Sequence, residues 1–309
     1  MQSPFEGKQP LGVVYNTTMS RPDAALTLAL LYGFAGKREA RMGAVCVNGS
    51  GLGAAVFCDV VHRFYTPGPP RNANQVLPPG LAASGTLPPD PPMLKAALER
   101  DYPRSVTKVS DTSLPEAVLR NGVIFNAQAV IVLSAPATYL AKTLELQGVN
   151  ELFKQRVKML VVVDAGERQD VPAMRRLLAD WPTPVVFCGR EVGEALPFPA
   201  SAIGKEFAWS PKNPVVDAWQ AFRSGPYDAP AWDMAALLHA VHPDLGYFGT
   251  DAGTIQVSDD GTMKFVAGEG AHLALRVDPA KKEKILQVLV ETAGAKPAQP
   301  QPRVRPPAK

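Results

Sequence analysis

The sequence predicts a single α/β domain, in which a mainly parallel central sheet is flanked by helices and a small antiparallel appendage follows near the C-terminus. Short β-branched runs alternate with helical patterns along most of the chain, which is typical of parallel sheets with crossover helices. The strand-like runs are apolar, as in strands buried on both faces. With 309 residues, 46% of them apolar, the chain is long enough for one large domain, with two smaller domains as the alternative.

Five apolar runs are predicted to be buried parallel strands, and each ends near Gly, Asp, Asn or Ser. They are Leu11–Tyr15, Gly43–Val47, Ala129–Leu133, Val157–Val163 and Pro184–Cys188. Six segments with helical periodicity lie among them: Asp23–Phe34, Gly53–Phe64, Leu114–Asn121, Thr138–Leu146, Val171–Leu178 and Ala231–Val241. In an open sheet of this kind we expect the functional site outside the carboxyl ends of the strands.

The C-terminal part follows a different pattern. Asp260-Gly261 stands between alternating residues in Val257–Phe265, which predicts an antiparallel hairpin. A last helix is predicted over Pro279–Thr292. The hairpin is the expected antiparallel appendage, and it precedes this helix.

Proline is unusually common, at 31 residues, and its positions indicate the organisation of the chain. Residues 66–92 form a Pro-rich loop that cannot be a central strand or the interior of a helix, and such loops are usually lids or surface wraps. Residues 296–309 are rich in Pro, Gln and Arg, which predicts a disordered tail. The α/β domain is therefore expected to span residues 1–295.

Composition argues against several classes of partner. The net charge is only +3, and no run of Lys and Arg is interleaved with aromatic residues, so we expect neither a nucleic-acid partner nor a membrane partner. Cys46, Cys58 and Cys188 are widely spaced and each adjoins apolar residues, which predicts buried free thiols.

The sequence leaves the compartment open. The apolar run Ala24–Leu31 is too short to span a bilayer, and the first ten residues contain no apolar segment of a signal peptide. A chain exported after removal of its leader would look the same. We therefore expect a soluble protein that is either cytoplasmic or exported.

One polar turn joins the first predicted strand to the first helix and carries a family resemblance. It reads Val14-Tyr15-Asn16-Thr17-Thr18-Met19-Ser20-Arg21-Pro22-Asp23-Ala24-Ala25-Leu26. This segment resembles the D-x-D-x-G-x-D-D loop of the inosine/uridine-preferring nucleoside hydrolase family, whose aspartates hold Ca²⁺ and generate the attacking water. Only Asp23 survives. Asn16, Thr18 and Pro22 occupy the other acidic positions, and Thr18 stands where the resemblance implies the general base.

Two later segments extend the resemblance in the same order. Ser134-Ala135-Pro136-Ala137-Thr138-Tyr139-Leu140-Ala141 is similar to the family's G-P-L-T-N-L-A element, so Thr138 is implied to offer a backbone carbonyl to the metal. Ala231-Trp232-Asp233-Met234-Ala235 is similar to H-D-P-x-A, so Asp233 is implied as a metal ligand, while Trp232 replaces the histidine that assists departure of the base. The similarity runs from about Leu11 to Phe265.

The groups implied to hold the ribose are less clear. In place of the family's acidic and amide cluster this chain has residues 164–170, so Asp164 or Glu167 is a candidate acid or base. Asn48 and Ser50 lie in a turn similar to the family's G-N step, and that turn is equally typical of a plain strand-to-helix connection. Asn16, Thr18, Asn48 and Trp232 are the candidate ligand-binding residues.

Two of the implied metal ligands also have a purely structural interpretation. Asp23 and Asp233 each precede an apolar helix and could cap their own helices. If instead the resemblance holds, Asp23, Thr138 and Asp233 should converge at one cleft. Two carboxylates and one carbonyl would make a minimal site, so we expect Ca²⁺ binding at the millimolar end of the known range, if any.

The resemblance implies a hydrolase of N-glycosidic bonds of ribonucleosides, with catalysis weakened or lost because the aspartate cluster is mostly replaced. The alternative is a pseudoenzyme that binds a nucleoside, a sugar-like ligand or another protein. The expected partner is a small molecule. A homo-oligomer is left open, since the family commonly forms dimers or tetramers.

Overall fold

The computed structural model describes residues 9–49, 51–67, 79–82 and 89–297. The strands of the central sheet, in chain order, are β1 (Leu11–Thr17), β2 (Ala40–Val47), β3 (Gly80–Leu81), β4 (Ala129–Ser134), β5 (Val157–Val163), β6 (Val185–Cys188), β9 (Phe248–Val257), β10 (Met263–Ala267) and β11 (His272–Val277). They lie in the order β10-β9-β11-β6-β5-β4-β1-β2-β3. The strands from β6 to β3 are parallel, and β9 pairs antiparallel with both β10 and β11. The predicted fold class is confirmed: one α/β domain with a mainly parallel sheet and an antiparallel C-terminal part.

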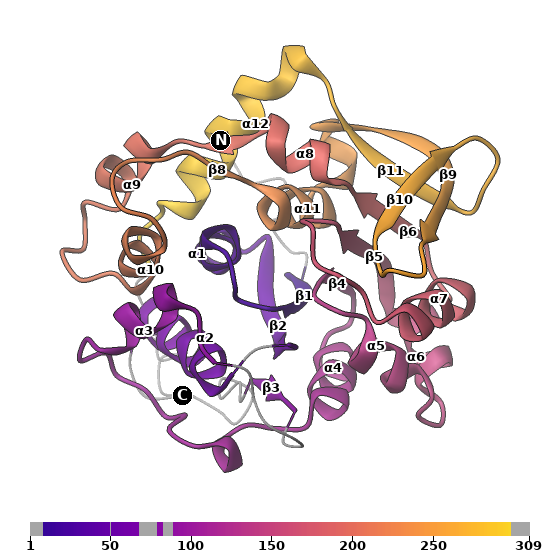
Figure 1. Cartoon of the computed structure of the whole chain (residues 1–309), viewed down its shortest axis with the longest axis horizontal. Coiled ribbons are helices and arrows are strands. Elements are labelled where there is room, and N and C mark those ends of the chain that lie inside the picture. Colours follow the sequence, from indigo (N-terminus) through magenta and orange to yellow (C-terminus); the bar gives the residue numbers. More distant parts are fainter. Residues whose placement is uncertain (1–8, 50, 68–78, 83–88, 298–309) are drawn as a thin grey trace, which may run out of the picture.

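Helices cover both faces of this sheet (Figure 1). Their bounds are α1 (Pro22–Gly36), α2 (Leu52–Tyr65), α3 (Pro92–Leu98), α4 (Pro115–Ile124), α5 (Thr138–Leu144), α6 (Val149–Arg156), α7 (Val171–Asp180), α8 (Arg190–Ala195), α9 (Ala200–Glu206), α10 (Pro214–Phe222), α11 (Trp232–Val241) and α12 (Lys282–Ala293). Short 3₁₀ turns cover Val109–Asp111, Pro243–Leu245 and Pro279–Lys281, and β7 (Pro197–Phe198) and β8 (Ala229–Pro230) form a separate antiparallel pair. In Figure 1, α1 and α11 lie on one side of the parallel strands and α4, α5 and α7 on the other.

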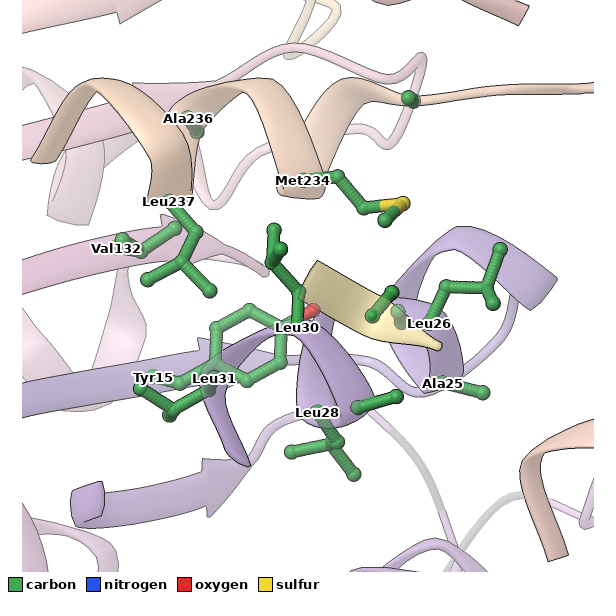
Figure 2. Close-up of a cluster of buried hydrophobic side chains, with 14 of the residues drawn as sticks. Tyr15, Ala25, Leu26, Leu28, Leu30, Leu31, Val132, Met234, Ala236 and Leu237 are labelled. Carbon is green, nitrogen blue, oxygen red and sulfur yellow. The ribbon is translucent and has the colours of Figure 1, made fainter. Parts of the chain in front are cut away.

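The two faces of the sheet bury two different cores. Along β1 the side chains alternate, so Val13 and Tyr15 belong to the core under α1 and α11, whereas Val14 belongs to the core under α4. Helix α1 is buried on all sides from Pro22 to Phe34, as expected for an interior helix with few polar residues. Figure 2 shows Leu30 of α1 near Tyr15 of β1 and Leu237 of α11. This packing holds α1 and α11 against β1.

Close packing of α1 against α12 depends on a glycine. A Cβ added at Gly33 would lie 1.9 Å from the carbonyl oxygen of Thr292, a backbone atom that cannot move away alone. We expect Gly33→Ala to lower the free energy of unfolding by about 1–3 kcal/mol through overpacking. The matched control is Gly204→Ala in α9, where a Cβ meets no atom within 4 Å. Urea unfolding should show the control unchanged or up to ~1 kcal/mol more stable, and equal effects at both positions would contradict the prediction.

Several element boundaries differ from the sequence expectation. The first two strands are longer than predicted, β1 by its C-terminal residues and β2 by its N-terminal ones, and the last helix begins with the 3₁₀ turn Pro279–Lys281. The hairpin is confirmed: residues 258–262 join β9 to β10, with Gly261 at φ +82°. Within the Pro-rich loop, Gly80–Leu81 forms an edge strand against β2 and α3 starts at Pro92. Residues 68–78, 83–88 and 298–309, which include most of the loop and of the predicted tail, lie outside the described residues.

All three cysteines are buried and free, as the sequence predicts. Across the described residues, no helix combines the length and hydropathy needed to cross a bilayer.

Candidate functional site

The chain reverses direction across the sheet between β1 and β4. Strand β2 follows β1 on one side, whereas β4 pairs with β1 on the other, so their carboxyl ends flank a topological switch point. Thr17 at the end of β1 stands opposite Ser134 at the end of β4. In open α/β sheets such points are where ligands bind. Two further segments lie at this switch point: the turn that leads from β1 into α1, and the first turn of α11. Hydrogen bonds join these two segments to each other.

Asp23 joins the starts of two helices. It lies in the first turn of α1 and is only 1% exposed. Its carboxylate accepts the backbone N–H of Asp233 at 2.6 Å and that of Met234 at 3.4 Å, both in the first turn of α11. The N-cap residue of α1 is Arg21, and its side chain makes no capping hydrogen bond. The local capping interpretation is therefore wrong for Asp23, which caps α11.

The carboxylate of Asp233 is held by three side chains from other segments. It accepts hydrogen bonds from the hydroxyl of Tyr15 on β1, from Ser134 Oγ on β4 at 2.6 Å, and from Arg21 Nη2 at 3.3 Å. Asp233 is fully buried. It does not cap its own helix, whose N-cap residue, Ala231, makes no side-chain cap bond either.

Burial disfavours the charged form of the carboxyl groups at this site. It raises the pKa of Asp23 well above its ordinary value, and the neighbouring charge of Asp233 raises it further. Burial, followed by the charge of Asp233, likewise raises the pKa of Tyr15, which therefore stays a neutral hydrogen-bond donor. The two carboxyl groups thus share a buried site in which a negative charge on both at once is unfavourable.

The raised pKa of Asp23 predicts a pH dependence of stability. The folded chain binds this proton more tightly than the unfolded chain, so the contribution is complete below the unfolded pKa of about 3.9 and is lost as pH rises toward the folded pKa. The unfolding free energy of the wild type minus that of Asp23→Asn should therefore fall from pH 5 to pH 7, by at most ~1.4 kcal/mol per pH unit.

The control for this titration is Asp260→Asn. Hydrogen bonds from Thr262 lower the pKa of Asp260, so this carboxyl is ionised in both states throughout pH 5 to 7. Urea unfolding at pH 5, 6 and 7 should give a flat difference for Asp260→Asn and a falling one for Asp23→Asn. A flat or rising difference for Asp23→Asn would rule out the raised pKa.

Arg21 is the site residue that the sequence interpretation missed. Its guanidinium donates to Asp233 and, at 3.1 Å, to Ser134 Oγ, and it forms an ion pair with Glu167. It also lies over the ring of Trp232, 5.6 Å from the ring centroid. One feature of the sequence could have identified Arg21: it is a single cationic residue in a turn that is acidic in the family that this segment resembles.

Of the candidate ligand-binding residues, Thr18, Asn48 and Trp232 make polar contacts within the protein, whereas Asn16 differs from them. Thr18 Oγ1 lies 2.7 Å from Ser20 Oγ. Asn48 donates to the carbonyl of Pro136 at 2.6 Å, which ties the turn after β2 to the turn after β4. The Asn16 amide is fully buried and has no hydrogen-bond partner among the described residues. Trp232 donates from Nε1 to the carbonyl of Arg190 at 2.9 Å. Ser50 is outside the described residues.

Of the remaining candidates, only Glu167 is joined to the carboxylate pair. Thr138 begins α5 and its hydroxyl donates to Asp170 at 2.8 Å. Asp164 accepts the N–H of Gly166 at 3.0 Å and so shapes its own turn. The structure brings together Asp23, Asp233, Trp232 and Glu167, with Arg21 between them, and records no hydrogen bond from Thr138 or Asp164 to either site aspartate within the described residues.

These residues do not fit a calcium ion. Ca²⁺ takes six to eight oxygen ligands, and its affinity grows with ligand charge. Within the described part of the chain, no group of three or more His, Cys, Asp or Glu side chains is arranged to hold a metal. The two buried carboxylates already accept hydrogen bonds from neighbouring groups, and a guanidinium stands against one of them.

Comparisons with known proteins identify the fold. No protein-family model matches the sequence, and no curated protein matches it either. Among solved structures, the inosine-uridine preferring nucleoside hydrolase from Bacillus anthracis has a TM-score of 0.63 at 12% identity, over 91% of this chain and 99% of that one. A plant nucleoside hydrolase has a TM-score of 0.65 at 15% identity, over 93% and 100% of the two chains.

A third similar structure is described as an effector protein, XOO4466, rather than as a hydrolase. Its TM-score is 0.61 at 13% identity, over 93% of this chain and 95% of that one. At such identities the similarity concerns the fold alone. The chain therefore has a nucleoside hydrolase-like fold, as the sequence resemblance implied.

Proposed function

We propose that this chain is a nucleoside hydrolase-like protein in which rapid hydrolysis of N-glycosidic bonds has been lost, and which binds a nucleoside or a sugar-like ligand at the switch point between β1 and β4. One observation carries the proposal. The two carboxylates that match the family's metal ligands are bound by the protein's own groups: Asp23 by the N-terminus of α11, and Asp233 by Tyr15, Ser134 and Arg21.

The chemistry expected at two further positions is also missing. A general base must accept a proton near its working pH, and the hydroxyl of Thr18, paired with Ser20, is not such a group. Trp232, where the resemblance implies a histidine, can donate only from its indole nitrogen, which is already bonded to the carbonyl of Arg190. Neither activation of water nor protonation of a leaving base is supplied at these positions.

A second candidate function is slow hydrolysis with Glu167 as the base. The side chain of Glu167 is 23% exposed, so solvent reaches it, and it lies beside the switch point through its contact with Arg21. That contact also weighs against the role, because a guanidinium stabilises the carboxylate that would have to accept a proton.

The test measures turnover and binding on the same purified sample. Release of free base from inosine and from uridine should run at least about 10²-fold below an ordinary enzymic rate of ~1 s⁻¹. Ligand-observed NMR should detect binding of a nucleoside or of ribose. Turnover at ~1 s⁻¹ would overturn the loss of catalysis, and Glu167→Gln compared with Asp164→Asn would then identify the base. Absence of any nucleoside or sugar binding would favour the protein-interaction alternative.

A further inference from the structure

We propose that the guanidinium of Arg21 is the built-in cation of this site, and that it closes to divalent metals the place where the fold's relatives are implied to bind one. Arg21 could play this part both in an inactive protein and in one that hydrolyses nucleosides slowly without a metal.

The first support is that Arg21 stands where a cation is otherwise disfavoured. It is the N-cap residue of α1, and its guanidinium contacts Asp233 in the first turn of α11. Helix N-termini carry partial positive charge and attract anions, so a guanidinium there is repelled unless carboxylates compensate. The arginine side chain turns inward nonetheless and is only 14% exposed.

The second support is the set of groups that the guanidinium contacts. Arg21 Nη2 reaches Asp233 Oδ1 at 3.3 Å and Ser134 Oγ at 3.1 Å, while Nη1 pairs with Glu167. The oxygen atoms that accept from the guanidinium come from α11, β4 and the loop after β5, three segments far apart in the chain. One fixed cation thus joins the segments that surround the switch point. Arginine side chains are always charged in proteins, so this site contains a permanent positive charge.

The third support is charge balance. Arg21 is a single positive charge that pairs with two carboxylates, those of Asp233 and Glu167, and a third carboxyl group, that of Asp23, accepts the backbone N–H of Asp233. The side chain of Asp233 is buried, so its negative charge could not be left without compensation at low cost. With Arg21 in place, an added divalent ion would meet a positive charge. With Arg21 removed, the carboxylates of Asp233 and Glu167 would lose the cation that they share, and an added divalent ion could take its place once these side chains rearrange.

The test is the response of thermal stability to Ca²⁺. Calorimetry and thermal unfolding of the full chain should detect no site in the wild type at up to about 10 mM Ca²⁺, which lies above the weakest known protein sites. Arg21→Ala should unfold at a lower temperature than the wild type, and 10 mM Ca²⁺ should raise its Tm by about 2–4 °C. Arg21→Lys, which keeps the charge, should show no Ca²⁺ response.

Arg63→Ala is the matched control. Arg63 also pairs with a buried carboxylate, that of Asp59, but no second carboxylate contacts that pair in the described residues. Its removal should lower Tm without creating a Ca²⁺ response. A Ca²⁺ site in the wild type that fills at or below about 10 mM would overturn the proposal, as would a folded Arg21→Ala variant whose Tm does not change with Ca²⁺. Arg21→Ala could fail to fold both with and without Ca²⁺. In that case a Ca²⁺ response of the wild type or of Arg21→Lys contradicts the proposal. The absence of a Ca²⁺ response in both of these proteins supports it. Loss or retention of nucleoside turnover affects none of these readouts.

Discussion

Replacing Asp233 with alanine is expected to lower the free energy of unfolding by about 3–5 kcal/mol, the usual cost of breaking a buried ion pair from one side. Its carboxylate is the common acceptor for Tyr15, Ser134 and Arg21, and it is fully buried. Without it, the Arg21 guanidinium loses one of its two carboxylate partners, and two buried hydroxyl groups lose their acceptor. Equilibrium unfolding in urea measures the loss.

Two variants separate this effect from a general cost of losing a carboxylate. Asp233→Asn keeps an oxygen acceptor without the charge and should cost less than Asp233→Ala. Asp259→Ala removes an exposed carboxylate that pairs with Arg175, and it should change stability by less than ~1 kcal/mol. A loss below ~1 kcal/mol for Asp233→Ala would mean that the network around this residue does not hold the site together.

Restoring an aspartate at position 18 is expected to leave hydrolysis of inosine or uridine within about tenfold of the parent. In a working site a general base contributes about 10²–10⁴ in rate. Here the restored carboxylate would still lack a leaving-group acid, because Trp232 remains, and a water-activating metal, because Arg21 contacts Asp233. Residues that act as a unit do not restore activity singly.

The comparison needs a variant that tests the same position without a new base. Thr18→Asn adds a polar side chain of similar size and no base, so its rate sets the background. Circular dichroism should show both variants folded before their rates are compared. If Thr18→Asp alone gains 10² or more over Thr18→Asn, the rest of the catalytic machinery is intact and the proposed loss of catalysis reduces to one residue.

Much of the fold could be predicted because it rests on local patterns. The five apolar runs became β1, β2, β4, β5 and β6, and the six helical patterns became α1, α2, α4, α5, α7 and α11. Apolar periodicity reports directly which faces a segment can bury. Elements that depend on distant partners were missed. Strand β11 and the first six residues of β9, which include Gly249 and Gly253, exist because they pair with each other and because β11 pairs with β6.

The sequence by itself determined the fold class, the polar turn after β1 and the two aspartates that approach each other. Only the tertiary structure decided what those aspartates do, because every partner of Asp233, and both N–H groups held by Asp23, come from segments about 100 residues or more away. No local pattern encodes such contacts. The contacts of Arg21 with Asp233, Ser134 and Glu167 likewise follow from how β4, α11 and the loop after β5 meet at the switch point.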